Sequence, residues 1–216
     1  MRGLVRVGAA VPSLALGNVK ENMKRHLAMM REAKEKHVSI VTFPELSLTG
    51  YTCGDLFFQR RLLDDVTDAL LALKDEMPEE ILAVVGAPLE IEGALYNCAV
   101  VLHKGEIISA VPKTFLPNNG EFYEKRWFQS GDARRDASVA IPKLKTDVCR
   151  QAIFETEDGV RFGIELCEDL WAPLPPSTML SVEGAEIILN LSASNELLSK
   201  REYRQQLISQ QSARCQ

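Results

Sequence analysis

Three apolar, strand-like runs of the sequence each end in a polar side chain that can take part in catalysis. These side chains are Glu45, Lys113 and Cys167. Because functional groups of α/β proteins gather beyond the ends of strands, we expect the three to lie close together. A cysteine thiolate is a nucleophile, a carboxylate can take and return a proton, and an ammonium can stabilise a developing oxyanion. The set indicates attack of a thiol on a carbonyl and departure of an amine.

Each of these residues also has an ordinary structural explanation. A glutamate after a strand is often a helix cap, a lysine after a proline is usually solvated, and a buried cysteine is usually a small hydrophobe. A thiol redox protein that uses Cys53 is a further alternative, because Cys53 lies near Glu45 in the sequence. No resolving-cysteine motif supports that alternative.

The elements that must position these side chains alternate between apolar runs and helical stretches, which is typical of an α/β fold. Asn18 can cap the first helix, and residues 114–137 are polar and aromatic, which indicates a long functional loop. We expect one domain with a mixed sheet. Its predicted elements are strands at 4–11, 38–43, 81–87 and 186–191, helices at 18–36, 61–76, 177–183 and 197–213, and hairpins at 96–111 and 151–166.

The composition excludes several classes of protein. The 216 residues include 25 basic and 30 acidic side chains, a net charge of −5, which disfavours nucleic-acid binding. No apolar run approaches the roughly 20 residues that a membrane-spanning helix needs. The five cysteines and three histidines form no Cys-x-x-Cys pair and no metal-ligand cluster, so we expect no metal and reduced thiols in the cytoplasm.

Several local segments resemble one protein family. Three segments resemble the signature segments of the nitrilase, or carbon–nitrogen hydrolase, superfamily, and they follow one another in the same order as in that family. They are residues 43–51, 112–118 and 165–171. The resemblance implies a nitrilase-like α-β-β-α sandwich with mixed sheets. The family's last strands would follow residue 216, so we expect the fold to be truncated at the C-terminus, and the exposed sheet edge to favour a homo-oligomer or a weakly stable chain.

Within that superfamily, the chain is similar to the glutaminase domains of glutamine-dependent NAD⁺ synthetases. This similarity is carried by residues 120–128, 189–194 and 212–215. We therefore expect residues 1–216 to form one carbon–nitrogen hydrolase (glutaminase) domain, with the synthetase domain absent from this chain.

The resemblance also implies roles for single residues. Glu45 would be the general base, Lys113 the oxyanion stabiliser and Cys167 the nucleophile. The family has a second glutamate shortly after the lysine, and Glu121 fits that place. The backbone N–H of Glu168 would complete the oxyanion hole.

The implied substrate is L-glutamine, whose α-ammonium and α-carboxylate need partners. The resemblance places Glu168 and Ser194 in the pocket for these groups, with Phe122 and Trp171 as walls. Asn119 stands where some members have a tyrosine, so a contact made by that ring is not expected here.

The implied role is to supply ammonia to a synthetase domain of the same longer protein, which amidates nicotinic acid adenine dinucleotide to NAD⁺. ATP and Mg²⁺ are expected only for that absent domain, because the chain has no P-loop and no Gly-rich nucleotide motif. No cofactor, nucleic acid or membrane is expected as a partner of this chain. Two alternatives stay open: a free-standing amidase that acts on another small amide or nitrile, and a non-catalytic fragment.

Overall fold

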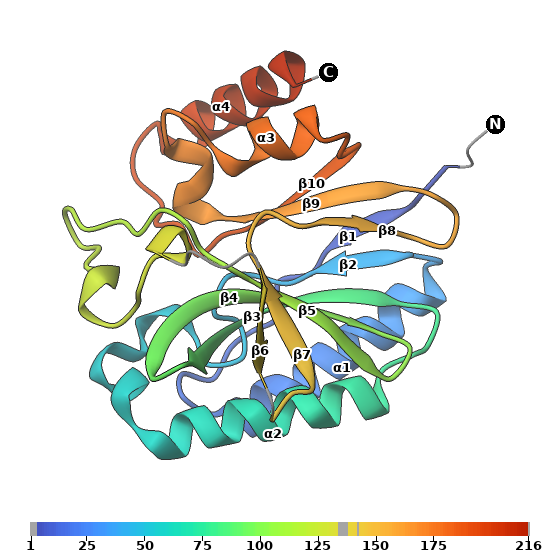
Figure 1. The fold of residues 1–216 in the computed structure, drawn as a ribbon, viewed down its shortest axis with the longest axis vertical. Helices are drawn as coiled ribbons and strands as arrows, with labels where there is room; N and C mark the ends of the chain where they lie inside the picture. Colours follow the sequence, from blue (N-terminus) through green and yellow to red (C-terminus); the bar gives the residue numbers. More distant parts are fainter. Residues whose placement is uncertain (1–3, 134–137, 142, 216) are drawn as a thin grey trace.

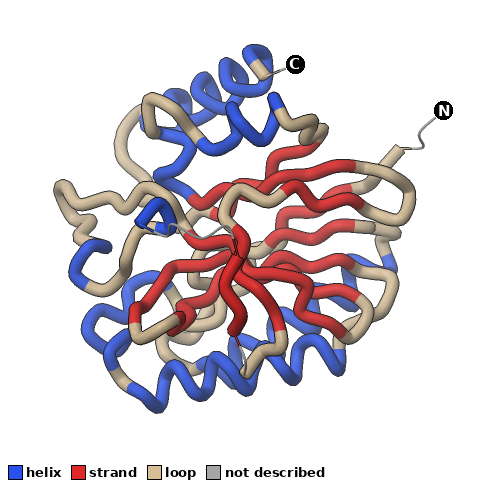
Figure 2. The backbone as a smooth tube through the Cα atoms, viewed as in Figure 1, coloured by secondary structure: helices blue, strands red, loops and turns tan. Residues whose placement is uncertain are grey.

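The computed structural model describes residues 4–133, 138–141 and 143–215. Two β-sheets lie face to face, and a pair of helices covers the outer face of each sheet (Figure 1). The strands lie in the middle of the molecule, and the longer helices lie on its outer sides (Figure 2). The predicted α-β-β-α sandwich with mixed sheets is confirmed.

The first sheet has seven strands in the order β1-β2-β3-β4-β5-β7-β6. Its first three strands are parallel, and β3, β4 and β5 are antiparallel neighbours. The helices α1 and α2 cover its outer face (Figure 1). The bounds are β1 Val7–Ala9, α1 Val19–Glu35, β2 Ile40–Thr42, α2 Arg60–Glu76, β3 Leu82–Ile91, β4 Ala94–His103, β5 Glu106–Pro112, β6 Ser138–Ile141 and β7 Thr146–Cys149.

The second sheet has three strands in the order β10-β9-β8, with β9 and β10 parallel. The helices α3 and α4 cover it on the side away from the first sheet (Figure 1). The bounds are β8 Ile153–Glu155, β9 Arg161–Leu166, α3 Pro176–Val182, β10 Ile187–Leu191 and α4 Lys200–Arg214. Short 3₁₀ helices span η1 Tyr51–Phe58, η2 Glu124–Arg126, η3 Gly131–Ala133 and η4 Cys167–Trp171.

Most of the predicted elements are present, and the differences are shifted strand ends and two short strands that were not predicted. A turn at Glu92-Gly93 joins β3 directly to β4. The strand β3 therefore ends later than the predicted residue 87, and β4 begins earlier than the predicted residue 96. The strands β6 and β7 were not predicted, since each has only four residues. The expected loop at 114–137 includes η2 and η3, and its residues 134–137 lie outside the described residues.

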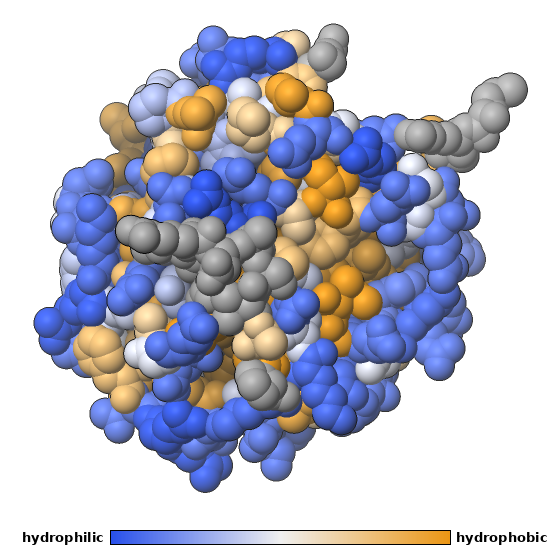
Figure 3. Space-filling model, in the orientation of Figure 1, coloured by the Kyte–Doolittle hydropathy of each residue, from blue (hydrophilic) through white to orange (hydrophobic). Residues whose placement is uncertain are grey.

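Apolar packing forms two layers. Between the sheets, Ile40, Val84 and Val101 of the first sheet meet Phe162 and Leu189 of the second. The outer layer packs the apolar stripes of α1 and α2 against the first sheet, as the helical spacing predicts. The face shown in Figure 3 is mostly hydrophilic, with apolar side chains gathered near its middle. Among the described residues, no helix is both long and apolar enough to span a bilayer.

The outer core layer should contribute strongly to stability. We expect Leu70→Ala in α2 to lower the free energy of unfolding by about 2–5 kcal/mol, because this fully buried side chain would leave a cavity. The matched change Leu198→Ala removes an exposed side chain and should stay within about 0.5 kcal/mol. Urea denaturation of both variants measures the difference, and equal losses would contradict this packing.

Candidate active site

Glu45 lies in the turn that follows β2, and the neighbouring strand β3 fixes that turn. A Cβ on Gly86 would lie 2.3 Å from the Pro44 oxygen and 2.4 Å from the Leu46 nitrogen. Only glycine therefore lets β3 pass so close behind the turn. Leu48 N–H donates to the Gly86 oxygen over 3.1 Å, which ties the end of the turn to the same strand.

A buried histidine supports the turn from the helix side. His26 of α1 is fully buried, and its Nε2 lies 2.8 Å from the Ser47 hydroxyl. Its Nδ1 lies 2.7 Å from the Asn22 oxygen. Burial lowers the pKa of His26 to about 4, so the ring is neutral at physiological pH. The neutral ring can donate to Asn22 and accept from Ser47, which makes it a structural support for the Glu45 turn.

The Glu45 carboxylate is 1% exposed and receives three hydrogen bonds. Its Oε1 accepts from Lys113 Nζ at 2.6 Å and from Asn97 Nδ2 at 2.7 Å. Its Oε2 accepts from the backbone N–H of Ala193 at 3.1 Å, just after β10. The two sheets therefore both hold this carboxylate in place.

Lys113, at the end of β5, is clamped between two carboxylates. Its Nζ donates to Glu45 and to Glu124 Oε1, each at 2.6 Å. Burial alone would lower the pKa of Lys113, but the two carboxylates outweigh it and raise the pKa above its ordinary value. Lys113 is therefore a permanently charged group in a buried site.

Glu124 is the second glutamate beside the lysine, and sequence reasoning missed it. Tyr51 Oη donates to its Oε1 at 2.6 Å, while burial and Glu45 raise the pKa of Glu124. Its buried Oε2 has no hydrogen-bond partner among the described residues. That atom is free to accept from a bound molecule.

The structure corrects the assignment of Glu121. Its side chain is exposed and accepts a hydrogen bond from the Asn195 amide, away from Lys113. The short helix η2 instead turns Glu124 inward toward the lysine. Both glutamates follow Lys113 closely in the sequence, so spacing alone could not distinguish them.

Cys167 stands at a sharp turn between β9 and η4. Its φ is +43°, a left-handed conformation that costs a non-glycine residue energy and is typical of functional sites. The buried Asp169 braces the turn. Its Oδ2 accepts from Leu166 N–H at 2.9 Å, and its Oδ1 accepts from Phe115 N–H at 2.7 Å. Asp169 thereby connects the cysteine turn to the segment after Lys113, while its burial raises its pKa to about 7.

The Cys167 thiol is held in its neutral form. Burial and the Glu45 charge raise the pKa of Cys167 to about 12, although Lys113 acts in the opposite direction. The backbone of Ala193 and the side chain of Ser192 also act to lower the pKa of Cys167, but more weakly than burial raises it. A thiol of this kind needs a base to remove its proton during attack, and Glu45 is the neighbouring carboxylate.

Three of the predicted pocket residues, Glu168, Phe122 and Trp171, gather around Lys200, and we call this group the rim. Lys200 Nζ lies 5.7 Å from the centre of the Phe122 ring and 5.5 Å from that of Trp171. Glu168 is half-buried, which raises its pKa, while Lys113 and Lys200 act to lower it. The rim therefore carries both a cation and a carboxylate between aromatic walls. Lys200 was not predicted, because nothing in its sequence neighbourhood marks it.

Ser194 lies at the same rim, and the start of α4 holds it. Its Oγ accepts from Arg204 Nη2 at 3.2 Å. Asn195 connects the two sides, because it donates to Glu121 and accepts from Lys200. The loop that carries Phe122 and the helix that carries Lys200 are thus joined across the rim.

Other candidate sites in the described residues have less support. Cys53 is buried and donates to the Thr49 oxygen at 3.3 Å, which fits a structural thiol better than a redox centre. No group of three His, Cys, Asp or Glu side chains in the described part of the chain could hold a metal ion.

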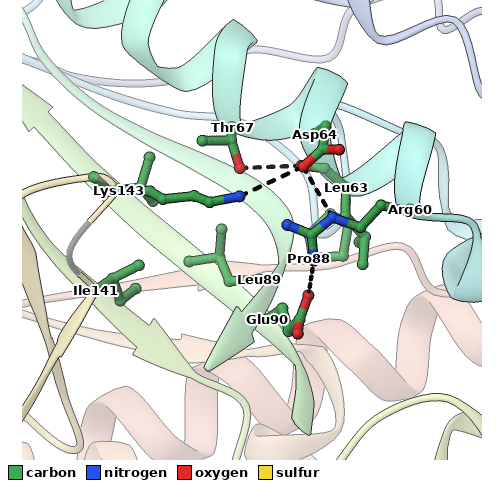
Figure 4. A pocket seen from close by; sticks show the side chains of 10 residues that line it. Arg60, Leu63, Asp64, Thr67, Pro88, Leu89, Glu90, Ile141 and Lys143 are labelled. Atoms are coloured by element: carbon green, nitrogen blue, oxygen red, sulfur yellow. Dashed lines mark hydrogen bonds and ion pairs between the residues drawn. The ribbon is translucent and has the colours of Figure 1, made fainter. Parts of the chain in front are cut away.

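A separate pocket of about 320 Å³ lies between α2 and β3 (Figure 4). Its charged side chains are engaged with one another: Arg60 pairs with Asp64 and Glu90, and Lys143 lies 3.6 Å from Asp64. Cys167, Glu45 and Lys113 are not among the residues that line this pocket.

Comparison with known proteins gives one family and a consistent set of relatives. The family model described as Carbon-nitrogen hydrolase matches residues 6–215. A glutamine-dependent NAD(+) synthetase of Mycobacterium tuberculosis is 37% identical over 99% of this chain and 32% of its own length. The corresponding Homo sapiens protein is 30% identical over 87% of this chain and 28% of its own length. The chain thus spans about a third of the length of these curated relatives.

Solved structures of similar fold include a synthetase and an amidase. The crystal structure of a glutamine-dependent NAD(+) synthetase from Cytophaga hutchinsonii has a TM-score of 0.86 and 28% identity, and covers 98% of this chain and 34% of its own. An amidase from Nesterenkonia AN1, of the nitrilase superfamily, has a TM-score of 0.75 and 16% identity, and covers 96% of this chain and 71% of its own. At that identity, the amidase shows likeness of fold alone.

The raised pKa of Cys167 is directly measurable. We expect no thiolate absorbance at 240 nm between pH 6 and 9 in the difference between the protein and its Cys167→Ala variant, because the thiol stays protonated below a pKa of about 12. The signal should appear only in more alkaline solution. A thiolate signal at pH 7 would show that the attraction of Lys113 dominates over burial and Glu45.

Proposed function

The chain belongs to the carbon–nitrogen hydrolase family, and from that premise we propose that it hydrolyses the side-chain amide of L-glutamine through a thioester on Cys167. The observation that carries the proposal is the buried cluster of Glu45, Lys113 and Glu124 beside a protonated thiol in a strained turn. It provides a nucleophile, a proton carrier and a fixed positive charge within one buried site.

The first half-reaction forms the thioester. Glu45 takes the thiol proton as the Cys167 sulfur bonds to the amide carbon, and the carbonyl π electrons move onto oxygen. Lys113 Nζ and the Glu168 backbone N–H stabilise that oxyanion. When the oxyanion collapses, the C–N bond breaks and Glu45 returns the proton to nitrogen, so ammonia leaves.

The second half-reaction releases glutamate. Glu45, again ionised, takes a proton from water as the water oxygen attacks the thioester carbon. The second oxyanion collapses, the C–S bond breaks, and the proton on Glu45 returns to the sulfur. The enzyme regains its neutral thiol, which its buried environment favours.

Glu124 has the free group that an amide substrate needs. Its Oε1 is occupied by Lys113 and Tyr51, but its buried Oε2 is unpartnered among the described residues. The NH₂ group of a primary amide can donate to this oxygen, whereas an ester or a nitrile has no such hydrogen. This contact would align the leaving nitrogen before attack.

The rim fits the charged end of glutamine. Lys200 can pair with the α-carboxylate and Glu168 with the α-ammonium, while Phe122 and Trp171 enclose the methylene chain. Ser194 adds a hydroxyl at the same place. A simple aliphatic amide or nitrile has no charged group that could pair with Lys200 or Glu168, so the amidase alternative is less well supported.

The fate of the ammonia belongs to the same proposal. The relatives named glutamine-dependent NAD(+) synthetase are about three times as long as the matched region, since it covers 32% of the Mycobacterium tuberculosis protein. We propose that a synthetase domain uses the ammonia to make NAD⁺, and that ATP and Mg²⁺ bind there. The domain boundaries, the homo-oligomeric state and the cytoplasmic location stay predictions.

Covalent labelling tests the substrate class. We expect 6-diazo-5-oxo-L-norleucine, an electrophilic glutamine analogue, to form one adduct on Cys167, seen by intact mass and peptide mapping. Excess L-glutamine should block the adduct, and Cys167→Ala should abolish it while the protein stays folded. An adduct that glutamine does not block would count against glutamine as substrate.

A pair of glutamate variants tests the site assignment. Glu124→Gln should lower kcat by roughly 100-fold or more, because it removes one of the two carboxylates on Lys113 and the acceptor for the leaving nitrogen. Glu121→Gln is the matched control, and its kcat should change by less than about threefold, because its side chain is exposed. Steady-state glutaminase assays compare them, and a larger loss in Glu121→Gln would reverse the assignment.

A further inference from the structure

An exposed carboxylate of η1 binds the segment that carries Glu124. Asp55 Oδ1 accepts from Arg126 Nε at 2.7 Å, and its Oδ2 accepts from Arg126 Nη2 at 2.7 Å. The Trp127 indole N–H donates to Oδ1 at 2.9 Å. The hydrogen bonds from Arg126 and Trp127 lower the pKa of Asp55, so the carboxylate is ionised throughout the physiological range. No step of the reaction described above uses this group.

The partners of Asp55 lie two and three residues after Glu124 in the chain. Glu124 and Arg126 are the first and last residues of η2, which has only three residues. Short 3₁₀ helices have weak internal hydrogen bonds, so contacts with neighbouring elements have to fix their position. The elements η1 and η2 share a buried polar contact, from Tyr51 Oη to the Glu124 carboxylate, and a surface contact, from Asp55 to Arg126.

Ring packing also joins the two elements, but it does not select one rotation of η2. The centre of the Phe57 ring of η1 lies 5.8 Å from that of Trp127 and 5.0 Å from that of Phe128. Apolar contact is non-directional, so these rings hold the elements together without fixing an angle. A two-point bond between a guanidinium and a carboxylate has a defined geometry. Asp55 therefore supplies the directional part of the contact.

The rotation of η2 decides where the Glu124 carboxylate lies. Its Oε1 has to reach Lys113 Nζ at 2.6 Å, and its Oε2, unpartnered among the described residues, has to face the leaving nitrogen. The hydrogen bond from Tyr51 reaches Oε1, so it leaves the direction of Oε2 open. A misplacement of about 1 Å in such a group can lower a rate by roughly 100-fold.

We propose that Asp55 is a positioning residue, which acts through Arg126 and Trp127 to fix the rotation of η2 and keep Glu124 directed at the amide. The side chains of Asp55 and Arg126 are both more than half exposed. An exposed ion pair contributes little to overall stability, so its loss should change the placement of Glu124 more than the stability of the fold. The inference rests on the role of Glu124 in the proposed function.

Asp55→Asn, compared with a matched control, tests the proposal. Asparagine keeps the size of the side chain but replaces one oxygen that Arg126 needs with an NH₂ group. We expect kcat for glutamine to fall roughly tenfold and KM to change by less than about threefold, because the rim is untouched. Asp65→Asn is the control: it removes the exposed pair of α2 in which Arg61 Nε lies 2.9 Å from Asp65 Oδ1, and it should leave kcat unchanged.

Two further variants separate positioning from a merely structural role. Arg126→Lys keeps the positive charge but loses the two-point bond, so its kcat should fall about as far as that of Asp55→Asn. In a Glu124→Gln background, Asp55→Asn should lower kcat no further, because the carboxylate that Asp55 positions is no longer there. An equal loss in both backgrounds, or an unchanged kcat in folded Asp55→Asn, would overturn the proposal. If Asp55→Asn does not fold, Arg126→Lys provides the same comparison.

Hydrogen exchange gives a readout that needs no turnover. The backbone N–H of Phe128 donates to the Glu124 backbone oxygen at 2.8 Å. Asp55→Asn should speed the exchange of a peptide that spans residues 123–128 roughly tenfold, whereas Asp65→Asn should not. Unchanged exchange would contradict the inference whatever the activity. Faster exchange in a protein that does not hydrolyse glutamine would refute the proposed function and leave the role of Asp55 in placing η2 standing.

Discussion

The ammonium of Lys113 between Glu45 and Glu124 is the interaction on which the rest of the site depends. All three groups are removed from water, and a buried charge is tolerated only when it is paired and hydrogen-bonded. The cluster has two carboxylates and one cation, so when all three groups are ionised its net charge is negative. Burial and the Glu45 charge together explain why Cys167 stays protonated although a lysine is near.

Backbone groups from distant elements hold the members of this cluster. Glu45 receives the N–H of Ala193, and Asp169 receives N–H groups from both the cysteine turn and the segment after Lys113. A backbone donor has fewer ways to move than a side chain, because the sheet already fixes its position. The strained turn at Cys167 can persist because the hydrogen bonds to Asp169 hold the backbone on both sides of it.

The sequence was sufficient to predict the architecture and the closeness of Glu45, Lys113 and Cys167. Helices with strong apolar periodicity, such as Arg60–Glu76, were predicted to within one residue, while four-residue strands such as β6 were missed because so short a run has no readable period. Glu124 could not be chosen over Glu121, because the turn of a short 3₁₀ helix decides which carboxylate faces inward. Lys200 was not predictable, because its neighbours at the rim come from other parts of the chain.

The contact between Ala193 and Glu45 joins residues 148 positions apart. Contacts between residues so far apart in the sequence form slowly relative to helices and hairpins, so this contact forms late in folding. Cys167 and Glu45 therefore reach their final positions only once β10 has joined β9 and the two sheets have docked. A growing or partly folded chain has the cysteine but not the site, and reactivity becomes a property of the completed sandwich alone.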